Sequence, residues 1–338
     1  MKIFKKLYAL AAFIAFFVSF SNMFSAMVPI QNALVALSRQ KFSMKVAAAV
    51  RDSVERFVEN QQAVAQNFKE EIEGIGGIIV KDFAIPEEHK KSLSERLKLF
   101  TPQPVFFRSA DDESVPYFGA LKAFNAVGLT MNKAAEKAFW NTDQKEQSRA
   151  IPRIATEKDF NRAQMEVMLD HECIHVKNGD ADLKTLFIFL SQNKEHFSDD
   201  EFYQIMGAFG EDFLSHRKVL AAAIIRDAEK IGIHDLRKIE NFDRDVTAYN
   251  RYYETRVDKI IVSSHDTKKI EAYRDYYQNR HDSPLFKERT ALVQAYVRQF
   301  VAKGLSIPLE LADFTHPTDR ERVNVCDTRL AELKAAKK

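Results

Sequence analysis

Apolar residues recur at helical spacing over most of the chain beyond its first 30 residues. Between residues 31 and 73 they stand three or four positions apart with charges between them, which predicts one or two amphipathic helices. Thr156 with Asp159, and Ser198 with Glu201, have the spacing of capping boxes at the starts of two further helices. We therefore expect helices at 157–177, 198–230, 242–262, 266–279 and 285–303, and a last one from Thr318.

Strand signals are few. Residues 77–80 are typical of a short strand, and residues 115–135 are weakly periodic, compatible with helix or strand. Prolines and charges over 84–104 indicate a surface connection around a short helix. The chain has 10 glycines and 9 prolines in 338 residues, about half of the usual share of roughly 12%. The expected fold class is therefore mainly α, with a minor β part.

The N-terminus has the layout of an export signal. Three lysines precede an apolar run at residues 7–20, and small residues follow it up to Ala26. Residues 7–28 are also long enough to cross a bilayer once as an uncleaved anchor. Both readings place the rest of the chain in the periplasm or at the outer face of a membrane. Removing residues 1–21 takes away three lysines and no acid, which changes the net charge from +2 to −1. The slight basic excess is therefore a targeting feature.

Three regions are expected from this organisation. Residues 1–26 form the signal peptide or anchor, 27–110 form a helical segment that packs on the body, and 111–338 form the main domain. Only two cysteines occur, Cys173 and Cys326, so a disulfide framework is excluded and burial of apolar surface must hold the fold together.

The expected helix at 157–177 contains His171-Glu172-Cys173-Ile174-His175, an HExxH motif. Side chains four residues apart lie one helical turn above each other, so both imidazoles can reach one metal ion while Glu172 faces its water. Two surface histidines on a helix are the alternative. Cys173 lies on the other side of the helix from His171, which favours a buried apolar role over a metal ligand or a redox switch.

A catalytic zinc site needs a third protein ligand. Glu254 and Asp258 share one face of the expected helix at 242–262, and a carboxylate on a second helix is the arrangement found in gluzincins. We expect Glu254 to bind the metal and Asp258 to orient a ligand imidazole. Taken alone, two such acids on a charged helix are usually a solvated face.

With these residues the sequence resembles the HtpX-like zinc peptidases, family forty-eight of the metallopeptidases. Three motifs carry the resemblance in the family's order, across residues 171 to 322. They are the HExxH motif continued by Asn178 and Asp180, the stretch Glu254-Thr255-Arg256-Val257-Asp258, and Thr315-His316-Pro317 with Arg322. A weaker match covers Asn125 to Asn132, which corresponds to the strand that borders the family's substrate cleft. The resemblance implies a zincin-type domain with a small β element at that cleft.

The resemblance also implies a ligand set. His171, His175 and Glu254 would bind one Zn²⁺ per chain and Glu172 would be the general base, with Asp258 hydrogen-bonded to His171. His316 and Arg322 would lie close to the site, where His316 either helps to stabilise the oxyanion or, like Arg322, has a structural role. Ile174 and Val257 stand where the family often has smaller residues, which affects helix packing. Membrane-embedded members carry several spanning helices, so this chain is nearer to the soluble periplasmic branch.

The predicted function is a zinc endopeptidase that cleaves exported or envelope proteins. In this prediction zinc activates a water molecule and Glu172 takes its proton. The alternatives are a zinc-bound chaperone or adaptor that uses the same cleft without cleaving, and a helical structural protein with an accidental motif. Residues 176–253 would be a lid or a partner-docking insert. Partners are protein or peptide substrates, with membrane association through the N-terminal segment. Lys and Arg are interspersed with Asp and Glu and form no basic stripe with aromatic residues, so nucleic-acid binding is not expected.

Overall fold

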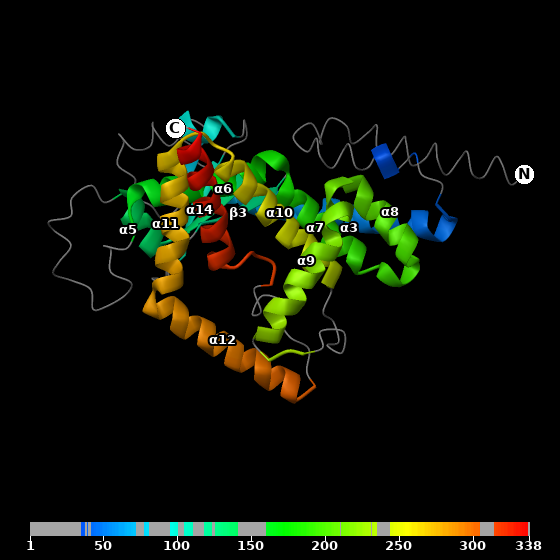
Figure 1. Ribbon diagram of the computed structural model, residues 1–338. Coiled ribbons are helices and arrows are strands. Elements are labelled where there is room, and N and C mark those ends of the chain that lie inside the picture. Colours follow the sequence, from blue (N-terminus) through cyan, green and yellow to red (C-terminus); the bar gives the residue numbers. More distant parts are fainter. Residues whose placement is uncertain are drawn as a thin grey trace, which may run out of the picture.

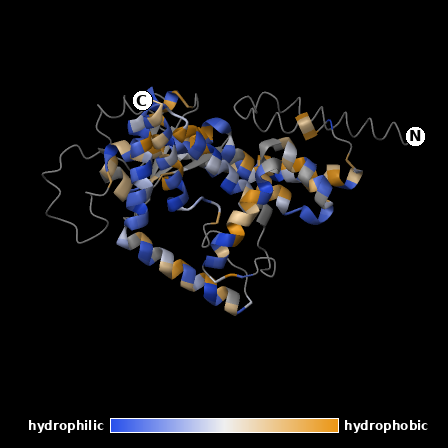
Figure 2. Cartoon of the chain, viewed as in Figure 1, coloured by the Kyte–Doolittle hydropathy of each residue, from blue (hydrophilic) through white to orange (hydrophobic). Residues whose placement is uncertain are grey.

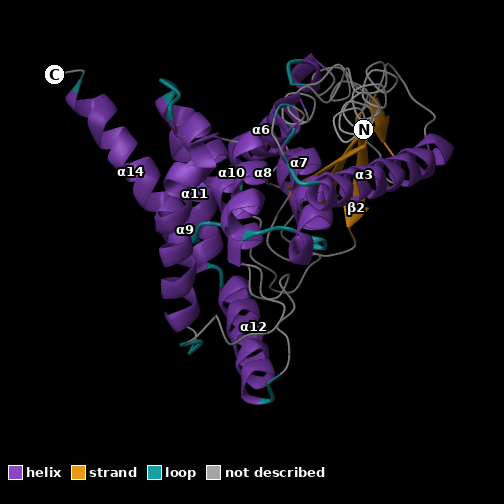
Figure 3. Cartoon of the chain, turned by 90° about the vertical axis from the view of Figure 1, so that its right-hand side faces the viewer, coloured by secondary structure: helices purple, strands orange, loops and turns teal. Residues whose placement is uncertain are grey.

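The computed structural model describes residues 35–37, 39, 42–71, 78–80, 95–100, 105–110, 118–123, 126–140, 160–209, 211–230, 232–234, 244–304 and 314–336. Over these residues the fold is mainly helical, as the hydrophobic pattern predicts (Figure 3). The strands gather at one end of the molecule, and helices form the rest of it (Figure 1).

Helices of eight or more residues make up most of the described chain. Hydrophobic and hydrophilic residues lie side by side along most of these helices, as is typical of amphipathic helices (Figure 2). In chain order, the described helices of eight or more residues are α3 (Met44–Glu71), α5 (Lys133–Trp140), α6 (Arg162–Asn178), α7 (Asp180–Ser191), α8 (Asp199–Phe209), α9 (Glu211–Lys230), α10 (Arg244–Val262), α11 (Thr267–Asp282), α12 (Pro284–Ala302) and α14 (Asp319–Ala335). The single helix predicted over 198–230 is therefore two helices, α8 and α9.

The helix that carries the HExxH motif begins later than predicted. Asn161 caps α6 by accepting the backbone N–H of Gln164 at 3.1 Å, and the Gln164 side chain accepts the N–H of Asn161 at 2.8 Å. This reciprocal pair is a capping box with the expected spacing, five residues beyond the predicted one at Thr156. Thr156 and Asp159 lie outside the described residues.

The second predicted capping box is confirmed. Ser198 donates its backbone N–H to the Glu201 carboxylate at 2.9 Å, and the Glu201 N–H reaches the Ser198 hydroxyl at 3.3 Å. Thr318 and Glu321 form the same device at the start of α14, where the sequence places the last helix.

The described strands form one four-stranded sheet in the order β1-β2-β4-β3. Its strands are β1 (Ile78–Val80), β2 (Val105–Ala110), β3 (Phe118–Ala123) and β4 (Ala126–Asn132). β1, β2 and β4 are parallel, and β3 pairs antiparallel with β4. The weakly periodic stretch at 115–135 is thus two strands followed by the start of α5. Because β1 and β2 precede residue 111, the segment 27–110 contributes half of this sheet and is not only helical.

The position of the sheet relative to α6 refines the expectation for residues 125–132. β4, which contains most of that stretch, is an inner strand between β2 and β3. β3 is one of the two edge strands, and it packs against both α6 and α7. The strand that borders the HExxH helix is therefore β3.

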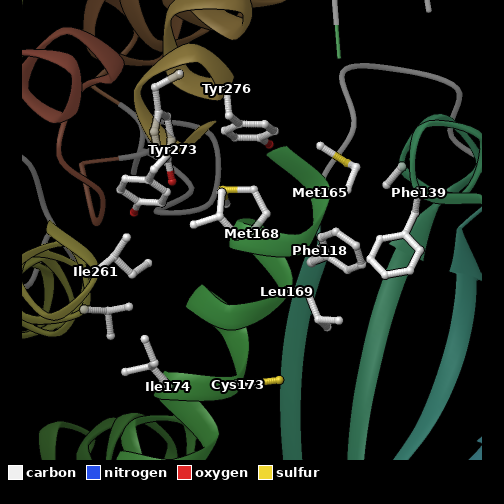
Figure 4. Close-up of a cluster of buried hydrophobic side chains, with 14 of the residues drawn as sticks. Phe118, Phe139, Met165, Met168, Leu169, Cys173, Ile174, Ile261, Tyr273 and Tyr276 are labelled. Carbon is white, nitrogen blue, oxygen red and sulfur yellow. The ribbon is translucent and has the colours of Figure 1, made fainter. Parts of the chain in front are cut away.

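Two hydrophobic clusters form the core. One lies among α3, α7, α8, α9 and α10, and the other joins the sheet, α5, α6, α11 and α14 (Figure 4). α10 belongs to both, because Tyr249 and Tyr253 enter the first cluster while Val257 and Ile261 enter the second. Glu254 and Asp258 are interleaved with these residues, so α10 places them where the two clusters meet.

The predicted leader, residues 1–26, lies outside the described residues. Among the helices of the described part, none is both long enough and apolar enough to cross a membrane. Cys173 and Cys326 are both buried with free thiols in the second cluster. The prediction of buried apolar cysteines is therefore confirmed, and burial raises the pKa of both thiols, that of Cys326 to about 12.

Candidate metal centre

Three side chains from two helices converge on one point. His171 and His175 stand one turn apart on α6, and their Nε2 atoms are 3.1 Å from each other. Glu254 of α10 closes the group, with Oε2 at 3.2 Å from His171 Nε2 and Oε1 at 3.4 Å from His175 Nε2. The three residues predicted as ligands are thus brought together, with both histidines buried and Glu254 partly buried.

The spacing of these atoms fits a small tetrahedral cation. Ligands at 2.0–2.1 Å from a tetrahedral centre lie about 3.4 Å from each other. The two ring nitrogens are 3.1 Å apart, and each lies near one oxygen of the Glu254 carboxylate, His171 Nε2 at 3.2 Å from Oε2 and His175 Nε2 at 3.4 Å from Oε1. Two imidazoles and one carboxylate are also the donor set of several catalytic zinc sites, whereas magnesium and calcium prefer oxygen ligands only.

The other ring nitrogen of His175 faces Asp180, whose Oδ2 lies 2.9 Å from His175 Nδ1. Gly179 makes this contact possible. Its φ of 72° ends α6 in the left-handed conformation, so α7 starts at once and Asp180 folds back over the last turn. Asp180 is 3% exposed and also accepts a hydrogen bond from Arg256. The His175 ring is therefore held with Nε2 toward Glu254.

The other ring nitrogen of His171 meets a tyrosine, which corrects the predicted contact with Asp258. Asp258 Oδ1 is 3.7 Å from His171 Nδ1, too far for a direct hydrogen bond. The Tyr273 hydroxyl lies between them, 2.9 Å from His171 Nδ1, and it donates to Asp258 Oδ1. Asp258 thus faces His171 through Tyr273 of α11.

Arg322 of α14 links the carboxylates of α10. Its Nη2 donates to Glu254 Oε2 at 2.8 Å and its Nε donates to Asp258 Oδ2 at 3.0 Å. A third hydrogen bond runs to the Tyr277 hydroxyl, and the guanidinium also lies 4.5 Å from the centroid of that ring. Arg322 is 4% exposed, so its charge is balanced inside the protein by these acids. The structure thus places Arg322 beside Glu254, the residue expected as the third ligand.

His316 precedes α14 and approaches the group from the solvent side. Its Nε2 lies 3.3 Å from Glu254 Oε1, and its Nδ1 lies 2.9 Å from the Thr315 hydroxyl. The His316 side chain is 38% exposed, compared with 17% for Glu254. It is therefore in reach of a molecule that enters the site from solvent.

Glu172 lies on α6 between the two histidines and is partly exposed. Within the described part of the chain, its carboxyl group forms no hydrogen bond or ion pair. Burial raises its pKa, an effect that the neighbouring His171 and His175 oppose. A carboxyl group that is free, beside a metal site and easier to protonate than usual is suited to proton transfer.

The charges of the group compensate each other. Burial alone would raise the pKa of Glu254, but His316, His175 and the hydrogen bonds of the histidines hold it well below its usual value. Burial alone would lower the pKa of His175, but Glu254 and Asp180 raise it to about 10. The acids around the ligands therefore favour a positive charge at this point, which a proton or a metal cation can supply.

Three residues around the ligands were not predicted as parts of the site. Asp180 follows the HExxH motif and Arg256 lies between the two acids of α10, but no sequence pattern indicates which side chains they contact. Tyr273 had a weaker signal. Together with Tyr276 and Tyr277 it forms an apolar stripe at helical spacing in a charged segment. Figure 4 shows Tyr273 and Tyr276 directed toward α6.

No family model, curated protein or solved structure matches the chain. The functional argument therefore depends on the geometry of these side chains and on their chemistry.

Proposed function

We propose that this protein is a zinc-dependent endopeptidase that hydrolyses peptide bonds of exported or envelope proteins. The observation that carries the proposal is the convergence of His171, His175 and Glu254 on one point, beside the unpartnered Glu172. The motifs that resemble the HtpX-like zinc peptidases contain the same residues. The zincin-type arrangement would consist of α6, α10 and the edge strand β3.

The orientation of the two imidazole rings is compatible with metal binding through both Nε2 atoms. His175 Nδ1 faces the Asp180 carboxylate, which only accepts hydrogen bonds. His171 Nδ1 faces the Tyr273 hydroxyl, whose proton is donated to Asp258. In a neutral ring, each Nδ1 atom therefore carries the proton and donates it. Each Nε2 then presents a lone pair. Two lone pairs and a carboxylate about 3 Å apart repel one another unless a metal cation or a proton lies among them. Zn²⁺ fits this set and leaves a fourth position for water.

The reaction follows from the residues around that position. When bound, Zn²⁺ lowers the pKa of its water and polarises the scissile carbonyl group. Glu172 accepts the proton of the attacking water and then donates it to the leaving amine, so the peptide C–N bond breaks without a covalent intermediate. His316, whose Nε2 lies 3.3 Å from Glu254 Oε1, would donate a hydrogen bond to the oxygen that gains negative charge. Glu254 is kept in place by Arg322.

The proposal is tested by metal analysis and by digestion of an unstructured protein such as reduced casein. Wild type should contain one zinc ion per chain and cleave the substrate. Glu172→Gln should keep the zinc and lose hydrolysis by at least about 100-fold, the lower range for a positioned acid or base. Glu254→Ala should lose both the zinc and the activity. Glu271→Gln removes an exposed carboxylate of α11 and should change neither.

Two outcomes would contradict the proposal. A wild type that binds no zinc would refute the metal centre. A wild type that binds zinc and an unfolded protein but never cleaves it would favour the alternative function, a chaperone or adaptor of the cell envelope.

A further inference from the structure

The two histidines of the metal centre are held in different ways. His175 contacts the carboxylate of Asp180 directly, at 2.9 Å. His171 contacts the hydroxyl of Tyr273, also at 2.9 Å, and the nearest oxygen of Asp258 is 3.7 Å away. The hydrogen-bonded connection between the Asp258 carboxylate and His171 therefore passes through the Tyr273 oxygen.

The directions of the hydrogen bonds follow from the groups involved. An ionised carboxylate only accepts, so the single proton of the Tyr273 hydroxyl points to Asp258. The lone pairs of the same oxygen are then left to accept the Nδ1–H of His171. Asp258 also forms an ion pair with Arg322, at 3.0 Å. This chain of bonds places the proton of neutral His171 on Nδ1 and leaves Nε2 as the ligand atom.

Tyr273 is rigid enough to fix its neighbour. It is 0% exposed, and its ring lies nearly parallel to that of His171, at 25° with 6.0 Å between the ring centroids. On its other side the ring meets Tyr277, which is bonded to Arg322. The hydroxyl therefore has one position, set by helices α11 and α14 together.

We propose that Tyr273 is a positioning residue of the metal centre, and that it transmits the hold of Asp258 to His171. The inference deepens the proposed function and rests on it, because it concerns the same site. It differs from the contact expected from sequence, in which Asp258 would bind His171 itself.

The experiment uses Co²⁺ as a probe in the full chain, with Zn²⁺ binding and hydrolysis by wild type measured first. Co²⁺ affinity is obtained by competition with a chelating dye. The paramagnetic ion also shifts the N–H resonances of its histidine ligands away from all others, so solvent exchange of each N–H can be followed by NMR. Tyr273→Phe removes only the hydroxyl oxygen. Tyr276→Phe removes the hydroxyl of a second buried tyrosine of α11 and serves as the matched control.

Tyr273→Phe should weaken Co²⁺ binding at least about 10-fold, the range seen when a partner of a metal ligand is removed. The N–H of His171 should exchange faster, while the N–H of His175, held by Asp180, should stay as in wild type. Asp180→Asn assigns the two resonances because it changes the second one. In an Asp258→Asn background Tyr273→Phe should cost less than about threefold, because both residues act through one chain of bonds. Tyr276→Phe should change neither readout.

Two results would overturn the inference while the proposed function stands. In the first, Tyr273→Phe keeps wild-type affinity and N–H exchange while Asp258→Asn loses affinity, which would mean that Asp258 acts directly. In the second, Tyr273→Phe loses the same affinity in both backgrounds, which would mean that Tyr273 acts by packing alone. A wild type without metal binding or hydrolysis would instead contradict the proposed function, so the two failures are distinguishable.

Discussion

Arg322 Nη2 lies 2.8 Å from Oε2 of Glu254, the oxygen that also faces His171 at 3.2 Å. Glu254, the proposed third ligand, is therefore held by a residue of α14. Because Arg322 also holds Asp258, one guanidinium sets the positions of both acids of α10. This contact makes α14 part of the site, although α14 begins 57 residues after the end of α10.

Replacing Arg322 should therefore affect both stability and metal affinity. Arg322→Leu leaves the buried carboxylate of Asp258 and the partly buried one of Glu254 without their guanidinium partner, which costs about 3–5 kcal/mol for a broken buried pair. Arg322→Lys keeps the charge but cannot form the planar fork that spans both acids, so its metal affinity should also fall. Urea unfolding of the metal-free protein measures the first effect, and Zn²⁺ titration measures the second.

Arg274→Gln provides the control for Arg322. Its ion pairs with Asp275 and Asp327 are at the surface, with about a third of the Arg274 side chain exposed. The loss should stay below about 1 kcal/mol, and zinc binding should be unchanged. If Arg322→Leu and Arg274→Gln lowered the free energy of unfolding equally, the buried ion pairs of Arg322 would contribute no more to stability than a surface pair.

The parts of the site that could be predicted from sequence are those set by local geometry. HExxH places two imidazoles on adjacent turns of one helix, whatever the rest of the fold does. Glu254 is 83 residues from His171, and it was found through its motif rather than through any contact rule. Tyr273 is 102 residues from His171, and its contact depends on α11 packing against α6. No periodicity within either helix contains that information.

In the fold, too, the features set by local sequence could be predicted, and those set by contacts between distant residues could not. Helix positions followed from apolar spacing, and the cap at Ser198 and the start of the last helix near Thr318 were located correctly. Strand β2 was missed because a short apolar run such as 105–107 suits a strand or a buried helix equally well. Its partners are β1 and β4, so the strand is stabilised by pairing with distant residues.

Gly179→Ala should lower both stability and zinc affinity. The native φ of 72° costs a residue with a side chain roughly 1–2 kcal/mol. A shift of the α6–α7 junction also moves Asp180 away from His175. Gly304→Ala is the matched control, because its φ is 64° and an added Cβ would meet no atom within 4 Å. Both variants should lose similar stability on thermal unfolding of the metal-free protein, and only Gly179→Ala should bind Zn²⁺ more weakly. A Gly179→Ala protein with wild-type zinc affinity would show that Asp180 does not hold His175.

Cys173 tests whether the residue inside the HExxH motif has a chemical role. It lies in the second hydrophobic cluster with 3% exposure, beside apolar residues of α6 and the sheet. Cys173→Ser should cost about 1–3 kcal/mol, because a hydroxyl replaces a thiol in an apolar site. Zinc content and hydrolysis should remain as in wild type when measured below the unfolding transition. Loss of zinc from a folded Cys173→Ser protein would instead assign a ligand role to the thiol.

Removal of the metal should destabilise the protein and abolish hydrolysis together. Binding to the folded state alone stabilises it by about 4 kcal/mol when free zinc is 1,000 times the dissociation constant. In the metal-free state, a proton on His175 replaces part of the missing charge, since Glu254 and Asp180 raise its pKa to about 10. A chelator should therefore lower the melting temperature by several degrees without unfolding the protein. Added Zn²⁺ should restore both properties, whereas Mg²⁺ should not, because it prefers six oxygen ligands. Glu254→Ala should melt at one temperature with and without the chelator. If chelation left the melting temperature of wild type unchanged while hydrolysis continued, peptide cleavage would not depend on this centre.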